Sequence, residues 1–157
     1  MQTVLFHSTI FGPIHSRRLG RSLGVNLSPI DGKVCSFDCL YCEAGFNAQG
    51  PGTTGLPCRA DVKRLLEGKL RDMSANGEPL DVITFSGNGE PTLHPEFEGV
   101  IEDTIGLRDK YFPQVKISVL SNSTMLHSGG VCRALRKVDN NILKLDSAIT
   151  PTMRAID

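Results

Sequence analysis

The sequence predicts an α/β fold in which apolar strands alternate with amphipathic helices and form part of a parallel barrel. Short runs of β-branched and aliphatic residues alternate with longer segments whose apolar residues recur at helical spacing. The runs lack the tight-turn residues that hairpins need, so we expect parallel pairing and right-handed crossovers. The pattern predicts about four β/α units, which is half to two-thirds of a full barrel.

Size and charge suit one domain in a reducing compartment. We assign residues 1–157 to a single core domain in which residues 1–22 form an N-terminal extension. The formal net charge is zero at pH 7, so nothing draws the whole chain to nucleic acid or to a membrane. We see no signal peptide and no apolar run of membrane-spanning length. Five cysteines, three of them clustered, argue against a disulfide framework and for the cytoplasm.

The N-terminal extension combines a short apolar segment with a basic loop. Residues 4–6 and 10–11 are apolar and could form a short strand or hairpin that ends before the Gly-Pro pair at 12–13. The loop that follows carries Arg17, Arg18 and Arg21. Three arginines so close together could bind a phosphate or a carboxylate, or they could simply form a solvated loop.

The remaining elements follow from the apolar periodicity. We expect a strand over 22–27, which ends at a Ser-Pro pair, and then a long loop over 43–58 that is rich in Gly and Pro. The further expected strands cover residues 81–85, 115–120 and 142–145. The expected helices cover residues 59–76, 96–110 and 130–138.

The last residues have the pattern of a helix start. Thr150 is a good N-cap, and Pro151 suits the first helical position. The chain ends six residues later. We therefore expect a chain that is truncated at its C-terminus, before the barrel is complete.

Three cysteines form the chemical centre of the sequence. Cys35, Cys39 and Cys42 lie within eight residues, directly after the strand expected over 22–27. Ligands in α/β folds bind at the carboxyl ends of such strands, and clustered thiols in a reducing compartment are metal ligands. Three thiolates could hold an iron–sulfur cluster with one open iron. They could also hold zinc, completed by Cys58, Cys132, His15 or His127.

A second motif follows the strand at 81–85. Gly87 and Gly89 let the backbone turn tightly and approach a ligand closely, and Glu90 offers a carboxylate at the strand's end. A plain strand-to-helix turn would also suit the residues Gly87, Asn88 and Gly89.

The run from Cys35 to Cys42 resembles the CxxxCxΦC signature of the radical S-adenosylmethionine superfamily, with Tyr41 as the aromatic residue. The resemblance implies that the three cysteines hold a 4Fe–4S cluster whose fourth iron binds S-adenosylmethionine. Reduction then cleaves this cofactor to methionine and a 5′-deoxyadenosyl radical, which abstracts hydrogen from a substrate that the sequence does not identify. Tyr41 would lie against the adenine.

The second motif resembles the superfamily's GGE motif, with Asn88 where the common pattern has Gly. Asn tolerates left-handed backbone better than most residues do, so the difference is acceptable. The resemblance implies that this motif binds the cofactor's methionyl end, and that further polar contacts come from the ends of the next two strands. The implied cofactor-binding residues are Tyr41, Gly87, Asn88, Gly89, Glu90, Ser121, Asn122, Lys144 and Asp146.

Longer stretches are similar to the wyosine-synthetase-like branch, which is named for enzymes that modify a tRNA guanosine. They are FGPIHSRRLGRSLGVNL, SGNGEPTLHPEF and KLDS. A tRNA substrate is thus possible, although the neutral net charge does not favour it. The resemblance also implies a flavodoxin- or ferredoxin-like reductant. A glycyl-radical activating enzyme, a structural zinc-binding module and an inactive fragment remain alternatives.

Overall fold

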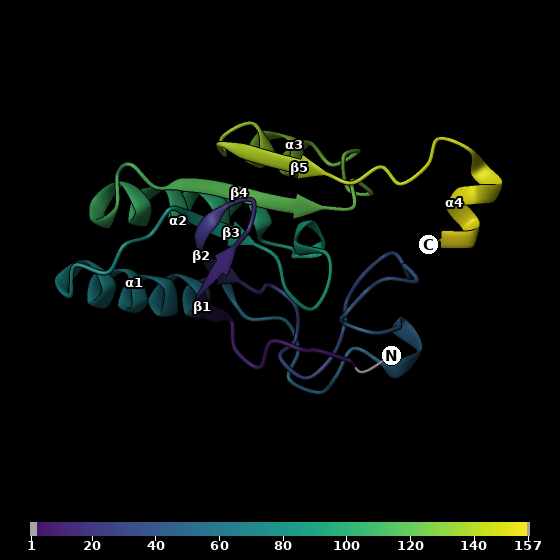
Figure 1. Cartoon of the computed structure of the whole chain (residues 1–157), viewed down its shortest axis with the longest axis horizontal. Coiled ribbons are helices and arrows are strands. Elements are labelled where there is room, and N and C mark those ends of the chain that lie inside the picture. The colour runs from purple at the N-terminus through teal and green to yellow at the C-terminus, as the bar shows by residue number, and fades with distance from the viewer. Residues whose placement is uncertain (1–2, 157) are drawn as a thin grey trace.

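Figure 1 shows the computed structural model of the chain, which describes residues 3–156. These residues contain one five-stranded sheet, in which the strands lie side by side in the order of the chain. The strands are β1 (Ile10–Ser16), β2 (Gly20–Val25), β3 (Val82–Phe85), β4 (Lys116–Ser121) and β5 (Asn140–Leu143). The α-helices are α1 (Arg59–Ala75), α2 (Phe97–Tyr111), α3 (Gly129–Leu135) and α4 (Thr150–Ile156). Two 3-10 helices are η1 (Asn47–Gln49) and η2 (Pro91–Leu93).

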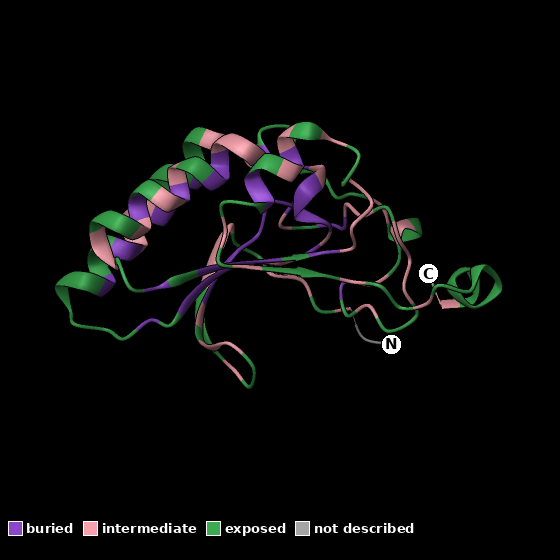
Figure 2. Cartoon of the chain, turned by 90° about the horizontal axis from the view of Figure 1, so that it is seen from above, coloured by how far each residue is buried: buried purple, intermediate pink, exposed green. Residues whose placement is uncertain are grey.

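The parallel part of the sheet confirms the predicted fold class. Strands β2 to β5 pair in parallel, and helices α1, α2 and α3 alternate with them along the chain. Figure 2 shows these three helices on the same face of the sheet, as right-handed crossovers require. The architecture is therefore a partial barrel. Within residues 3–156, no helix combines the length and the apolarity that crossing a membrane requires.

The hydrophobic core fills the space between the sheet and these helices. Helix α1 turns one apolar stripe inward, and in Figure 2 the buried faces of the helices point toward the sheet. The buried residues of this stripe are Val62, Leu66, Leu70 and Met73. Alternate residues of the central strands complete the core from below, namely Ile83, Phe85, Ile117 and Val119. The opposite face of the sheet carries no helix in Figure 2.

Strand β1 differs from the expectation. It runs antiparallel to β2 and continues to Ser16, so the prediction that it would end before the Gly-Pro pair at 12–13 was wrong. A bulge between Phe11 and Ile14 accommodates the pair, and proline is tolerated there because β1 is an edge strand. Gly24 of β2 permits the pairing, since a Cβ atom there would lie 2.1 Å from the Phe11 ring.

Strand β5 begins two residues earlier than the expected range of 142–145. Its pairing with β4 sets Asn140 opposite Ser118 and Leu143 opposite Ser121. Lys144 therefore follows the strand, and its backbone N–H donates to the Ser121 carbonyl at 2.8 Å. The helix expected over 130–138 is also shorter and ends at Leu135. The predicted helix start near the C-terminus is present, although α4 begins at Thr150, one residue before the predicted first position at Pro151.

The core position of Leu66 makes a direct test of this packing. Replacing Leu66 by Ala should lower the free energy of unfolding by about 2–5 kcal/mol, because it removes buried methyl groups and leaves a cavity. The neighbouring Leu65, which is 39% exposed, is the matched control and should lose less than about 1 kcal/mol as Ala. Urea unfolding measures both. Equal losses would contradict the assignment of the buried face of α1.

Candidate functional site

The predicted site residues come together at one edge of the sheet, where the parallel strands β2 to β5 end. We call this the carboxyl edge. In Figure 1 the arrowheads of β4 and β5 point toward it, and the loops after β2 lie on the same side. The cysteine loop, residues 35–42, follows β2, and the turn at 87–90 follows β3. Parallel strands that end together make this edge the usual ligand site of α/β folds.

Glu90 links the ends of β3 and β4. Its side chain is only 4% exposed, and its two oxygens share four hydrogen bonds. Oε1 accepts from the Thr92 backbone N–H (3.0 Å), the Thr92 hydroxyl (2.5 Å) and the Ser121 hydroxyl (2.8 Å). Oε2 accepts from the backbone N–H of Asn122 at 2.6 Å. The predicted residues Ser121 and Asn122 are therefore held directly by Glu90.

Gly89 attaches the segment that leads into the cysteine loop. It forms a parallel bridge with Val34, and the next backbone N–H, that of Glu90, donates to the Val34 carbonyl at 2.9 Å. A Cβ atom at Gly89 would lie 2.0 Å from this carbonyl oxygen. Only glycine allows the two backbones to approach so closely. The bridge sets the first cysteine, Cys35, beside the turn at 87–90.

Asn88 is fully buried, and its side chain holds protein segments together. Nδ2 donates to the carbonyls of Phe6 and Pro29, both at 2.9 Å, and Oδ1 accepts from the Phe6 backbone N–H at 2.8 Å. The Asn that replaces Gly of the common pattern thus fastens the N-terminal segment to the loop after β2. Any contact between Asn88 and a cofactor would have to come from its backbone.

Asn26, at the end of β2, explains the glycine at position 87. Its Oδ1 accepts from the backbone N–H groups of Ser28 and Asn88, both at 3.1 Å. A Cβ atom at Gly87 would lie 2.3 Å from this Oδ1. Its Nδ2 is buried and has no hydrogen-bond partner among residues 3–156. Sequence reasoning did not single out Asn26, because an Asn at the end of a strand looks like ordinary turn chemistry.

A buried lysine gives the cysteine loop its shape. Lys33 is 4% exposed, and its Nζ donates to the carboxylate of Asp38 at 3.1 Å and to the carbonyl of Gly45 at 2.8 Å. The same Asp38 oxygen accepts from the Asn47 backbone N–H at 2.7 Å. This backbone N–H, together with the ammonium group, holds the pKa of Asp38 below its ordinary value. Lys33 therefore joins the middle of the loop to the segment after Cys42.

Asn122 connects the end of β4 to the first cysteine. Its Nδ2 donates to the Ser36 hydroxyl at 2.8 Å and lies 3.6 Å from the sulfur of Cys35. Its Oδ1 accepts from the Thr124 backbone N–H at 3.1 Å and from the Thr124 hydroxyl at 2.7 Å, which fixes the orientation of the amide. A predicted cofactor-binding residue thus contacts a predicted metal ligand.

Lys144 reaches the second cysteine from the end of β5. Its Nζ lies 2.9 Å from the sulfur of Cys39 and 2.7 Å from the carboxylate of Asp146. It also lies over the rings of Phe37 and Tyr41, 5.0 and 5.3 Å from their centroids. The Tyr41 hydroxyl donates to Asp146. Burial and this carboxylate raise the pKa of Tyr41, although Lys144 opposes the change.

A cavity of about 180 Å³ opens beside this cluster. Three of the predicted residues line it, namely Asn122, Lys144 and Asp146. Phe37 of the cysteine loop and Met153 of α4 add apolar surface. A mixed lining of this kind suits a ligand with both polar and apolar parts.

Within residues 3–156 none of the three cysteines forms a disulfide, and each is of intermediate burial. Within residues 3–156, the structure gathers no group of three His, Cys, Asp or Glu side chains that could hold a metal ion, so the convergence of the three sulfurs stays a prediction. The chemistry of the donor set nevertheless fits an iron–sulfur cluster. Nitrogen donors from Asn122 and Lys144 face two of the sulfurs, as hydrogen-bond donors do around the sulfurs of iron–sulfur sites.

The remaining candidates lie elsewhere. Cys58 contacts Asp61 at the start of α1, and Cys132 contacts a backbone carbonyl near α3. The described part of the chain combines neither of them, nor His15 or His127, with the three thiols in a metal-holding group. Arg17 and Arg18 lie in the turn between β1 and β2, before the start of β2, and thus at the opposite edge of the sheet.

Sequence reasoning also missed Lys33, Asp38 and Asn47, which shape the cysteine loop. Asn47 supplies a backbone N–H to Asp38, and its Nδ2 donates to the carbonyl of Cys35 at 3.1 Å. The sequence carries no signal for the role of Lys33, because a lysine in a loop is usually exposed.

Asp31 fastens the long loop after the cysteines to the segment before them. Its carboxylate accepts from the backbone N–H and the hydroxyl of Thr53 at 2.8 and 2.7 Å. It also accepts from the same two groups of Thr54 at 3.2 and 2.7 Å. These hydrogen bonds hold the pKa of Asp31 well below its ordinary value, with the Thr53 backbone N–H the largest cause.

Curated relatives match most of the chain. No protein-family model matches the chain. It is 32% identical over 148 residues to a UPF0026 protein of Helicobacter pylori. This match covers 94% of this chain and 46% of the Helicobacter pylori protein. It is also 36% identical over 142 residues to a UPF0026 protein of Synechocystis sp. This second match covers 87% of this chain and 48% of the Synechocystis protein. The chain thus spans about half the length of the curated relatives it matches.

Among solved structures, the chain is similar to BtrN, whose crystal structure was determined in complex with AdoMet and 2-DOIA. The TM-score is 0.53 and the sequence identity 18%, over 85% of this chain and 49% of BtrN. At this identity the likeness concerns the fold. The chain therefore shares its fold with about half of BtrN, while the radical S-adenosylmethionine superfamily and its wyosine-synthetase-like branch stay predictions for this chain.

Removing the buried ammonium group should loosen the cysteine loop. Lys33→Met leaves Asp38 and the Gly45 carbonyl without their shared donor, so we expect a loss of about 1–3 kcal/mol in the free energy of unfolding. We also expect faster alkylation of Cys35, Cys39 and Cys42, measured cysteine by cysteine by mass spectrometry. Lys63→Met is the control, because Lys63 is half exposed and makes a surface ion pair. Equal effects of the two variants would contradict the role of Lys33.

The Asp31 contacts predict a specific acid response. The pKa of Asp31 is lower in the folded state, so its stabilisation is present above the unfolded pKa of about 3.9 and is lost as the pH falls through the folded value. Asp31→Asn should therefore show a smaller decrease in melting temperature on acidification below about pH 4 than the unmodified chain. The exposed Asp72→Asn variant should follow the unmodified curve. An unchanged pH curve for Asp31→Asn would contradict the prediction.

Proposed function

We propose that this chain is the part of a radical S-adenosylmethionine enzyme that binds a 4Fe–4S cluster and S-adenosylmethionine. The observation that carries the proposal is the bridge between Val34 and Gly89, which sets the CxxxCxΦC loop directly beside the turn that ends in Glu90. The fold supports it too, since BtrN is a protein whose structure contains AdoMet.

In this proposal Cys35, Cys39 and Cys42 hold the cluster. When bound, the cluster supplies the electron that cleaves S-adenosylmethionine to methionine and a 5′-deoxyadenosyl radical, which abstracts hydrogen from the substrate. The chain's own residues position the reactants and limit the access of water. Lys144 and Asn122 orient the thiol groups that they contact, and the Lys33 contacts hold the loop on which all three thiols lie.

The cofactor's methionyl end would lie at the turn over 87–90. Glu90 Oε2 accepts one hydrogen bond within the described chain, so it retains capacity for a further donor such as the methionyl ammonium group. Asp146 and Tyr41 would lie near the ribose and the adenine. Ser121 would contribute indirectly, since its hydroxyl is engaged with Glu90.

We also propose a flavodoxin- or ferredoxin-like electron donor, because the cluster must be reduced before the cofactor is cleaved. The stretches shared with the wyosine-synthetase-like branch make a tRNA nucleoside a possible substrate class. The zero net charge of the chain gives no additional support for tRNA. The proposal therefore specifies the cofactor chemistry and not the substrate.

The cluster provides the first test of the proposal. After anaerobic reconstitution we expect about four iron and four sulfide per chain. Changing Cys35, Cys39 or Cys42 to Ala should reduce the iron content to less than about a tenth, because no other thiol of the loop can replace the lost ligand. Cys58→Ala is the control and should retain the cluster.

Binding of the cofactor to the cluster provides the second readout of this experiment. The electron paramagnetic resonance spectrum of the reduced protein should change when S-adenosylmethionine is added, as an open iron requires. A colourless protein with one zinc, or a Cys39→Ala protein that keeps its full iron content, would overturn the proposal.

A further inference from the structure

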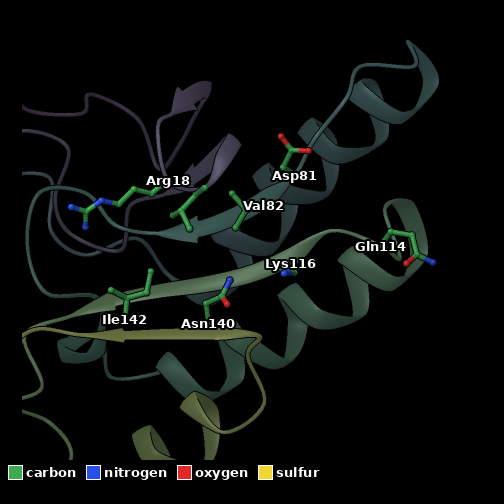
Figure 3. A pocket seen from close by; sticks show the side chains of 8 residues that line it. Arg18, Asp81, Val82, Gln114, Lys116, Asn140 and Ile142 are labelled. Atoms are coloured by element: carbon green, nitrogen blue, oxygen red, sulfur yellow. The ribbon is translucent and has the colours of Figure 1, made fainter.

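A second cavity lies at the opposite edge of the sheet, where β3, β4 and β5 begin. Its volume is about 510 Å³, within the range of small-molecule sites. Figure 3 shows Arg18 extending from the β1–β2 turn on one side, with Lys116, Asn140 and Ile142 coming from β4 and β5 on the other. Asp81 and Gln114 also line the cavity.

The charges of this cavity are unbalanced. Arg18 and Lys116 both line it, and no side chain among residues 3–156 forms an ion pair or a hydrogen bond with either cation. Among the described lining residues, Asp81 carries the only carboxylate, and it accepts the backbone N–H of Arg21 at 2.7 Å. The cavity therefore has an excess of positive charge. In contrast, several cations on the helices are paired with carboxylates, as in Arg59–Asp103.

The sheet surface beside the cavity is polar as well. Thr84, Ser118 and Asn140 lie opposite one another on three neighbouring strands, on the face away from the helices. The Asn140 Nδ2 donates to the Ser118 hydroxyl at 3.0 Å, and the hydroxyls of Thr84 and Ser22 are 2.7 Å apart. Bulky branched residues usually fill the interior of such barrels, so these hydroxyl and amide groups suit a polar ligand instead.

We propose that this cavity binds the oxyanion group, a phosphate or a carboxylate, of a polar small molecule. The guanidinium of Arg18 can hold two oxygens of such a group, and the ammonium of Lys116 adds a second charge. The amides of Gln114 and Asn140 provide further hydrogen-bonding groups for the rest of the ligand. This site lies apart from the cysteine loop and does not depend on a cluster, so it goes beyond the proposed function.

The lining favours a small molecule over a nucleic acid backbone. A polynucleotide needs a continuous basic surface, whereas this cavity is concave and includes the carboxylate of Asp81. The zero net charge of the chain also gives no long-range attraction to a polyanion. A small anionic molecule, in a cavity whose lining includes two cations together with amide groups, matches the lining best.

The test is a titration of the ¹⁵N-labelled chain with inorganic phosphate, followed by amide chemical shifts. Sodium acetate serves as the carboxylate probe, and sodium chloride at equal ionic strength is the control. We expect saturable shifts confined to residues around Arg18, Lys116 and Asn140, with phosphate or acetate but not with chloride. Tighter binding of phosphate than of acetate identifies the group as a phosphate, and the reverse order identifies a carboxylate.

Variants of the lining test which side chains hold the anion. Arg18→Gln and Lys116→Gln should each weaken binding about tenfold, as the loss of a charge-assisted hydrogen bond implies. The matched control is Arg17→Gln, which removes the same charge from the same turn but not from the cavity lining, and it should bind as the unmodified chain does. Lys116→Gln could disturb β4. Arg18 lies in an exposed turn, so Arg18→Gln should leave the fold intact and still tests the anion site. Shifts that do not saturate, equal shifts with chloride, or equal weakening by Arg17→Gln would overturn the proposal.

Discussion

The carboxylate of Glu90 is buried where β3 and β4 end, and the rest of the site depends on how that charge is satisfied. A buried carboxylate is costly unless donors surround it. Thr92, in the segment after β3, donates to it. Ser121 and the backbone N–H of Asn122 donate from the end of β4. Asn122 then reaches Cys35, so one network runs from the turn after β3 to the first thiol. The need to satisfy Glu90 therefore orders the carboxyl edge as a unit.

The cysteine loop is held by polar contacts more than by apolar packing. Lys33 joins Asp38 to Gly45, and Asn47 closes the same ring of contacts through its backbone and its side chain. The Lys33 ammonium is buried although the Asp38 side chain is partly exposed, so a loop conformation that removed its partners would leave a buried charge unpaired. These contacts therefore favour one loop conformation over others. For a loop that is proposed to hold a cluster, a fixed conformation reduces the rearrangement that binding requires.

The two edges of the sheet offer different chemistry on the same framework. The carboxyl edge gathers thiols, the Glu90 carboxylate and Lys144, whereas the opposite edge presents Arg18 and Lys116 to a larger cavity. Both edges consist of loops and strand ends, while the helices and the buried face of the sheet supply the core. The core can therefore keep its packing while the two edges carry separate binding functions.

The sequence by itself determined the alternation of strands and helices, the position of the three thiols after the first parallel strand and the turn that ends in Glu90. These features are local, because periodicity and short motifs need only neighbouring residues. Only the tertiary structure decided the antiparallel pairing of β1, the register that places Lys144 beyond β5 and the burial of Lys33. It also decided that Asn88 binds Phe6, 82 residues away, and that Arg18 shares a cavity with Lys116. Such contacts join residues far apart in the chain, and their geometry exists only once the sheet has formed.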